Sequence, residues 1–135
     1  MFLTEDDFKT VIDSDQLTKV VGNNPSLLGE AILIAVDEMT SYLNNRYDVA
    51  VAFDTVGTDR NSFLVLRCAD IALYHLYSRI AARNIPELRG IRYAEAIDWL
   101  KMVNKGNVHL NLPIKVIENQ AGYILFGGNP RFNFR

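Results

Sequence analysis

Few residues in this 135-residue sequence have both the type and the spacing that catalysis or metal binding requires. His75 and His109 are the two histidines, and they stand on different predicted elements, without the HxxxH or HExxH spacing of metal ligands. Cys68, the single cysteine, lies among apolar residues, so we expect a buried hydrophobic side chain rather than a reactive thiol. His75 is likewise expected to be a hydrogen-bonded core histidine. The sequence therefore predicts no metal site and no bound cofactor.

Asp70 stands in the most apolar predicted helix, with Arg67 one turn before it and Tyr74 one turn after it. A carboxylate in such surroundings needs a partner. It would be either a catalytic acid or half of a polar pair that fixes how the helices pack. We favour a structural pair of Arg67 and Asp70, with Tyr74 or an arginine of another helix as further possible partners, because no second carboxylate or nucleophile stands nearby in the pattern. The chain is therefore expected not to be an enzyme.

Composition narrows the class of protein. The chain is 49% hydrophobic and 22% charged, which fits one globular domain with a core of its own. Its formal net charge of −2 argues against a free-standing nucleic-acid binder, which is usually basic. No stretch reaches transmembrane length, and the acidic start at residues 1–7 does not match a secretory signal. We therefore expect no membrane partner.

Apolar side chains recur at helical spacing over most of the chain. They predict two short helices and then three long ones, over residues 4–12, 14–21, 26–46, 61–83 and 87–105. The helix at 61–83 is apolar almost all round, as expected of the central buried helix of a bundle. Residues 49–58 are expected to form a loop or a short irregular segment, with Asp59 as the cap of the next helix. The fold class is thus mainly α, a helical bundle over residues 1–106.

Residues 107–135 have a different character and are predicted to form a C-terminal arm. Two β-prone runs, 114–117 and 123–126, indicate a hairpin-like structure, followed by an extended tail. The tail begins with a glycine pair, a natural hinge, and its two phenylalanines are too far along the chain to reach their own core. We expect them to dock onto a partner. The hypothetical partner-binding residues are Asn129, Arg131, Phe132, Phe134 and Arg135.

Taken together, these segments resemble a family of small phage proteins of unknown function. It is found in the head-morphogenesis clusters of Mu-like phages and prophages. The resemblance runs in order along nearly the whole chain, which makes it more specific than any single motif. The segments that carry it are Phe2-Leu3-Thr4, Tyr42-Leu43, Arg46-Tyr47-Asp48, Gly57, Asp59-Arg60-Asn61, Asp70-Ile71-Ala72-Leu73-Tyr74-His75-Leu76, Pro86-Glu87, Arg92-Tyr93, Ala96-Ile97-Asp98-Trp99-Leu100, Lys105-Gly106 and Gly127-Gly128-Asn129-Pro130-Arg131.

The resemblance implies a helical protein similar to the head–tail connectors and head-completion proteins of tailed phages. Such a protein is made in the cytoplasm of the bacterial host and assembles as a ring of identical subunits in the virion neck. It contacts the portal and the tail or other neck proteins, and DNA passing through the lumen touches it only incidentally. The family carries no established catalytic residues. This chain departs from it in the apolar stretch 114–126, where a more polar linker is expected, so the route of the arm stays open.

Two other classes remain as alternatives. A small helical regulatory or nucleic-acid-binding protein would need a helix–turn–helix pair with a basic recognition helix, and the sequence contains no such helix. An enzyme comes third, because the titratable residues form no catalytic constellation.

Overall fold

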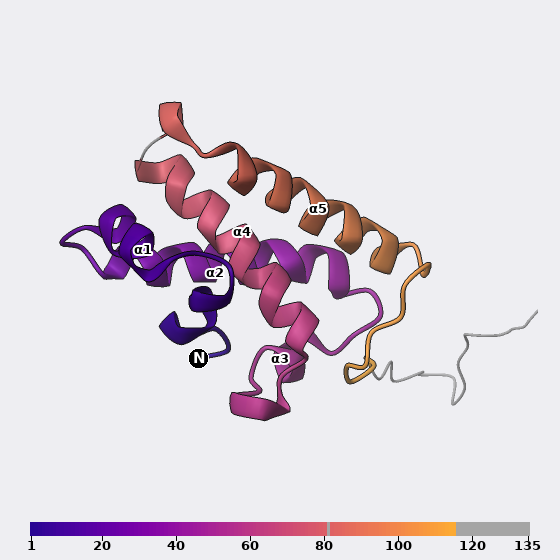
Figure 1. The fold of residues 1–135 in the computed structure, drawn as a ribbon. Helices are drawn as coiled ribbons and strands as arrows, with labels where there is room; N and C mark the ends of the chain where they lie inside the picture. Colours follow the sequence, from indigo (N-terminus) through magenta and orange to yellow (C-terminus); the bar gives the residue numbers. More distant parts are fainter. Residues whose placement is uncertain (81, 116–135) are drawn as a thin grey trace, which may run out of the picture.

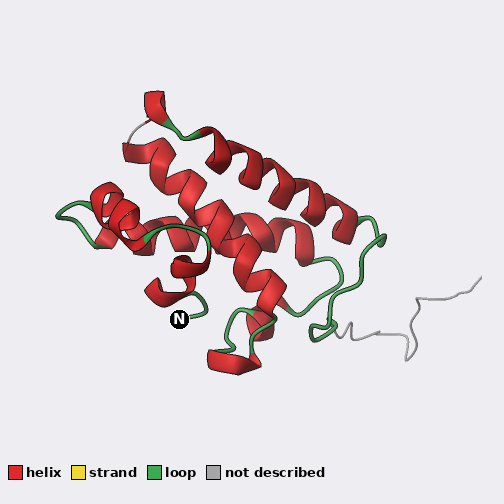
Figure 2. Ribbon diagram, in the orientation of Figure 1, coloured by secondary structure: helices red, strands yellow, loops and turns green. Residues whose placement is uncertain are grey.

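The computed structural model describes residues 1–80 and 82–115, and every regular element within them is helical (Figures 1 and 2). The predicted mainly α fold is confirmed. None of the described helices is long and apolar enough to cross a membrane. In chain order the elements are η1 (Glu5–Thr10), α1 (Ser14–Val21), α2 (Ser26–Leu43), α3 (Val49–Ala52), η2 (Gly57–Asp59), α4 (Ser62–Ile80), η3 (Ala82–Asn84) and α5 (Glu87–Asn104), where η marks a 3-10 helix.

Helix α4 is the centre of the bundle, as its apolar sequence predicts. It packs against both α2 and α5, which also contact each other, and α1 and η1 lie against it (Figure 1). Small side chains at the contacts between the three long helices let their backbones approach closely. The fully buried alanines at these contacts are Ala35, Ala69, Ala72 and Ala96. Cys68 is buried in the same helix, and burial raises the pKa of its thiol to about 12, so it acts as a small hydrophobic residue.

Local sequence signals explain most of the helix ends. Gly22, with a φ of 63°, ends α1 in the left-handed region that glycine adopts without strain. Helix α2 ends at Leu43 rather than continuing to Arg46 as predicted. The predicted cap of α4 was wrong: Asp59 belongs to η2, and the side chain of Asn61 accepts the N–H of Leu64 at 3.0 Å.

The segment at 49–58 is not a plain loop. It contains the single turn of helix α3, which begins where the side chain of Asp48 accepts the N–H of Val51 at 3.3 Å. Ala52 is buried, and Phe53 packs against the core with its ring 5.0 Å from that of Phe2. A cap and two core contacts are enough to hold one helical turn that is too short to show a periodic pattern.

The predicted C-terminal hairpin gains no support from the described residues. Residues 1–80 and 82–115 contain no strand. Ile114, at the start of the first predicted run, instead forms an isolated antiparallel bridge with Tyr47, far back in the chain. The second run, 123–126, and the tail lie outside the described residues.

Candidate functional site

The last described residues, 107–115, are clamped to the corner where α2 leads into α3, and we call them the arm root. The N–H of Asp48 donates to the carbonyl of Pro113 at 2.8 Å, and the N–H of Lys115 donates to the carbonyl of Arg46 at 2.8 Å. These two bonds flank the bridge between Tyr47 and Ile114. The first residues of the predicted arm are thus bonded to the bundle on both sides of this bridge.

Side chains strengthen the same clamp. The buried hydroxyl of Tyr47 accepts the N–H of Leu110 at 2.8 Å, and Nη1 of Arg46 lies 2.8 Å from Nδ1 of His109. The ammonium of Lys115 donates to the carbonyl of Asn44 at 3.3 Å. Apolar side chains of the root also pack against the core, namely Val108, Leu110 and Leu112. Residues 107–115, assigned from sequence to the arm, therefore lie against the bundle.

Asp70 is fully buried, and its main partner is Arg92 of α5. Both nitrogens of a guanidinium edge reach it: Nε of Arg92 lies 3.1 Å from Oδ1, and Nη2 lies 3.0 Å from Oδ2. Arg67, the partner named from sequence, is more distant, with Nη1 at 3.9 Å from Oδ2. Tyr74 instead stacks on Tyr93, with ring centroids 4.1 Å apart.

The geometry at Asp70 suits packing rather than catalysis. Burial raises the pKa of its carboxyl, and the hydrogen bonds and charge of Arg92 act in the opposite direction. Both carboxylate oxygens accept from Arg92, and the side chain is 0% exposed, so a substrate cannot reach it. Within residues 1–80 and 82–115, no three His, Cys, Asp or Glu side chains come together in a group that could hold a metal ion. The pair therefore fastens α4 to α5.

A second polar cluster joins all three long helices and was not found from sequence. Glu38 of α2 accepts at both carboxylate oxygens: Oε1 lies 2.7 Å from Nε2 of His75 on α4, and Oε2 accepts the hydroxyl of Tyr93 on α5 at 2.7 Å. Burial, followed by the Glu38 hydrogen bond, raises the pKa of Tyr93. His75 is thus half-buried and paired with a carboxylate.

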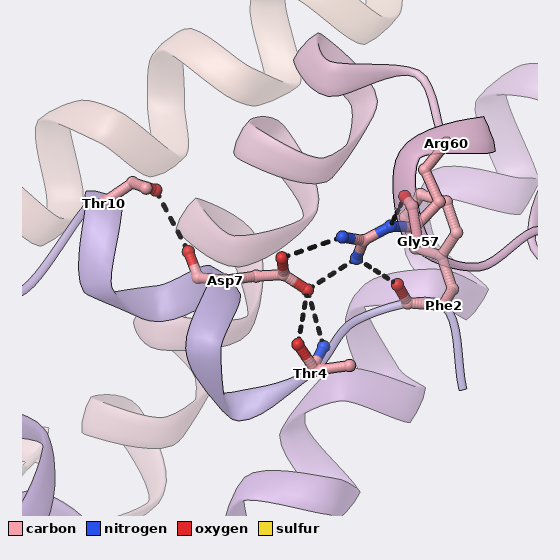
Figure 3. A network of polar contacts seen from close by, with 6 residues as sticks. All are labelled: Phe2, Thr4, Asp7, Thr10, Gly57 and Arg60. Carbon is pink, nitrogen blue, oxygen red and sulfur yellow. Dashed lines mark hydrogen bonds and ion pairs between the residues drawn. The ribbon is translucent and has the colours of Figure 1, made fainter.

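The third cluster ties the N-terminal segment to η2 (Figure 3). The guanidinium of Arg60 meets Asp7 through two bonds, Nη1 to Oδ2 at 2.6 Å and Nη2 to Oδ1 at 3.0 Å. The same guanidinium donates to the carbonyls of Phe2 at 2.7 Å and Gly57 at 2.8 Å, while Thr4 donates its N–H to Asp7 at 2.7 Å. All of these residues are drawn in Figure 3, and their bonds hold the N-terminal segment against the chain at Gly57 and Arg60.

Asp7 is charged in this network at neutral pH. Burial opposes its charge, but the hydrogen bonds from Arg60 and Thr4 outweigh burial and hold the pKa of its carboxyl below the ordinary value of 3.8. In the sequence, Asp7 is only one of three consecutive acidic residues near the start of the chain.

The family model described as "Bacteriophage Mu, Gp36" matches residues 2–123. The chain belongs to this family. It is therefore a phage protein. No curated protein matches the chain, and no solved structure matches it either.

The match to the Mu family spans the whole described bundle. It takes in η1 through α5 and the arm root, so all three polar clusters and the clamp fall within the family region. The proposed partner-binding residues lie beyond the matched stretch and outside the described residues. These are Asn129, Arg131, Phe132, Phe134 and Arg135.

Proposed function

We propose that the protein is a non-catalytic structural subunit of the phage virion that joins the head to the tail. In this proposal, copies of the chain form a ring in the virion neck and contact the portal on one side and the tail or other neck proteins on the other. DNA passes through the lumen and meets the subunits only incidentally. The observation that carries the proposal is the clamp on the arm root, which holds residues 107–115 against the corner between α2 and α3.

The clamp on the arm root affects the free energy of binding, because binding through a chain terminus costs conformational entropy. Ordering each free residue costs roughly 1–2 kcal/mol of backbone entropy, while burying one phenylalanine returns roughly 1.5–3 kcal/mol. Holding the arm root against α2 and α3 reduces the number of residues that must be ordered when Phe132 and Phe134 bind a neighbour. Membership of a Mu phage family supports the proposal. The sequence resemblance adds to it, because the family that the chain resembles is found in head-morphogenesis clusters.

Exposed apolar side chains supply surface for contacts between subunits. Leu33 and Ile34 on α2 are 61% and 47% exposed, and Leu88 and Ile91 on α5 are 55% and 49% exposed. A ring needs two different surfaces on each subunit, one for each neighbour. We assign these two surfaces to α2 and α5.

A complementation assay tests the role of the arm. Phage that lack the gene are supplied with wild-type protein, with protein truncated after Gly127, or with the double variant Phe132→Ala/Phe134→Ala. Asn133→Ala is the matched control, since it lies between the two aromatic positions. Tailed particles counted in micrographs should disappear with the truncation and the double variant, and should reach normal numbers with the control.

Two results would contradict the proposal. Normal numbers of tailed particles with the truncated protein would exclude the arm as the joining element. Tight binding of the isolated chain to duplex DNA at physiological salt would favour the alternative, a small regulatory or nucleic-acid-binding protein.

A further inference from the structure

A hollow of about 390 Å³ lies between α1 and the first turn of α5, at the end of α5 away from the arm root. Gln16 and Lys19 line it from α1, Tyr77 lines it from α4, and Arg89 lines it from α5. None of the three polar clusters includes these four residues. The hollow is therefore separate from these three clusters.

Arg89 is the residue that bundle packing leaves unexplained. It is only 5% exposed, and its Nη2 donates to the carbonyl of Val11 at 3.2 Å. Its Nη1 is buried as well, yet has no hydrogen-bond partner among the described residues. A buried donor on a charged group costs the full desolvation of that group when it is unpaired. Because the Arg89 side chain lines the hollow, we expect a ligand seated there to complete the bonding of its guanidinium.

The charge of Arg89 also lacks a direct counter-ion. Asp70 is the carboxylate that influences it, but both oxygens of Asp70 are taken by Arg92. Arg89 forms no ion pair in residues 1–80 and 82–115. Burial lowers the pKa of its guanidinium, although a guanidinium in a protein stays protonated at neutral pH. The hollow thus borders on a buried positive charge that forms no direct ion pair within the described residues.

The start of α5 adds to the positive potential. Pro86 precedes the helix and provides no side-chain cap, so the first-turn N–H groups carry the positive end of an 18-residue helix dipole without a capping side chain. The ammonium of Lys19 is exposed and makes no ion pair in the described chain. Glu87 is the acidic residue of this turn, but it is exposed and does not line the hollow.

We propose that this hollow binds a single oxyanion group, held by Arg89 and Lys19 at the N-terminus of α5. Phosphate ion and the side-chain carboxylate of a neighbouring protein share this chemistry, since both offer oxygens that accept from a guanidinium edge. The site does not rest on the proposed role in head–tail joining, because all of its residues belong to the bundle itself.

Thermal melting at constant ionic strength tests the site with two probes, inorganic phosphate and a short neutral-ended peptide containing one glutamate. Chloride at matched ionic strength is the reference. Either probe should raise the melting temperature of the wild-type protein in a saturable way, because a ligand that binds only the folded state stabilises it. The probe with the lower dissociation constant identifies the source of the oxyanion.

Three variants make the test specific. Arg89→Met should lose the saturable rise in melting temperature, and Lys19→Gln should weaken binding by roughly tenfold, the loss expected when one charged contact is removed. Lys101→Gln, at the far end of α5, carries the same charge change and should bind as the wild type does. If Arg89→Met does not fold, Lys19→Gln decides, since Lys19 is exposed and supports no packing.

The proposal would be overturned by either of two outcomes. One is that neither probe stabilises the wild-type protein beyond chloride. The other is that Lys19→Gln and Lys101→Gln respond equally, since binding would then not be local to the hollow. Chemical shifts of the Leu88 and Arg89 amides during titration provide a readout that is independent of stability, and they should move only in variants that bind.

Discussion

Replacing Arg92 by methionine leaves the Asp70 carboxylate buried without its two-bond partner. The Asp70 side chain is 0% exposed, so water cannot replace the lost hydrogen bonds. Arg67 remains, but its closest nitrogen is 3.9 Å from Asp70, beyond a good hydrogen bond. Breaking a buried ion pair by removing one partner costs about 3–5 kcal/mol. The Arg92 side chain is 31% exposed, which reduces the loss, so we expect about 3 kcal/mol.

A double variant separates the pairing from the packing. In Asp70→Leu/Arg92→Met both charges are gone, and the apolar side chains fill similar volume between α4 and α5. Replacing a buried pair by hydrophobic residues is often neutral or stabilising, so this variant should regain most of the stability that the single variant loses. Arg83→Met, at an exposed arginine of η3, is the control for loss of a positive charge alone and should stay within about 0.5 kcal/mol of the wild type.

Urea unfolding followed by circular dichroism gives the free energy of unfolding of each variant. The account is refuted if Arg92→Met loses less than about 1 kcal/mol, or if the double variant is as unstable as the single one. Either result would mean that Asp70 is not held mainly by Arg92.

Three further predictions concern the core, the N-terminal network and the arm root. Leu76→Asp, at a residue 1% exposed in α4, should unfold the protein, whereas Leu33→Asp, at a residue 61% exposed, should keep the wild-type helix content by circular dichroism. Because the pKa of Asp7 is lowered on folding, its stabilisation is present above the ordinary value of 3.8 and is lost as pH falls through the lower folded-state pKa. Asp7→Asn should therefore lose about 2 kcal/mol at pH 7 and flatten the acid limb of a stability–pH curve, and an unchanged acid limb would contradict this. Tyr47→Phe should cost about 1 kcal/mol and speed amide exchange at Leu110, whose N–H the Tyr47 hydroxyl accepts, and unchanged exchange would argue against the clamp.

Sequence reasoning found the features that depend on neighbours in the chain. The spacing of apolar residues located α1, α2, α4 and α5, and Gly22 marked the end of α1. It missed α3 because four residues, Val49–Ala52, are too few to show a helical period, although Asp48 is the type of residue that caps a helix. A periodic pattern needs several helical turns to be recognised, so it finds long helices and misses a single turn.

The polar clusters could not be predicted from spacing because their members are distant in sequence. Glu38 and His75 are 37 positions apart, and Asp7 and Arg60 are 53 apart. Which acid meets which base is decided by how α2, α4 and η2 pack, and no local signal encodes that choice. For Asp70, the sequence indicated the need for a partner and favoured Arg67, with an arginine of another helix as an alternative that it could not identify. The packing of α5 instead brings Arg92 closer.

The central claim is that the chain is a head–tail joining subunit. Its most direct test is electron microscopy of the protein incubated with its purified portal. We predict a ring of copies stacked on the portal, present with the full-length chain and absent with the chain truncated after Gly127. A portal that stays bare with the full-length chain, under conditions where the bundle is folded by circular dichroism, would contradict the account.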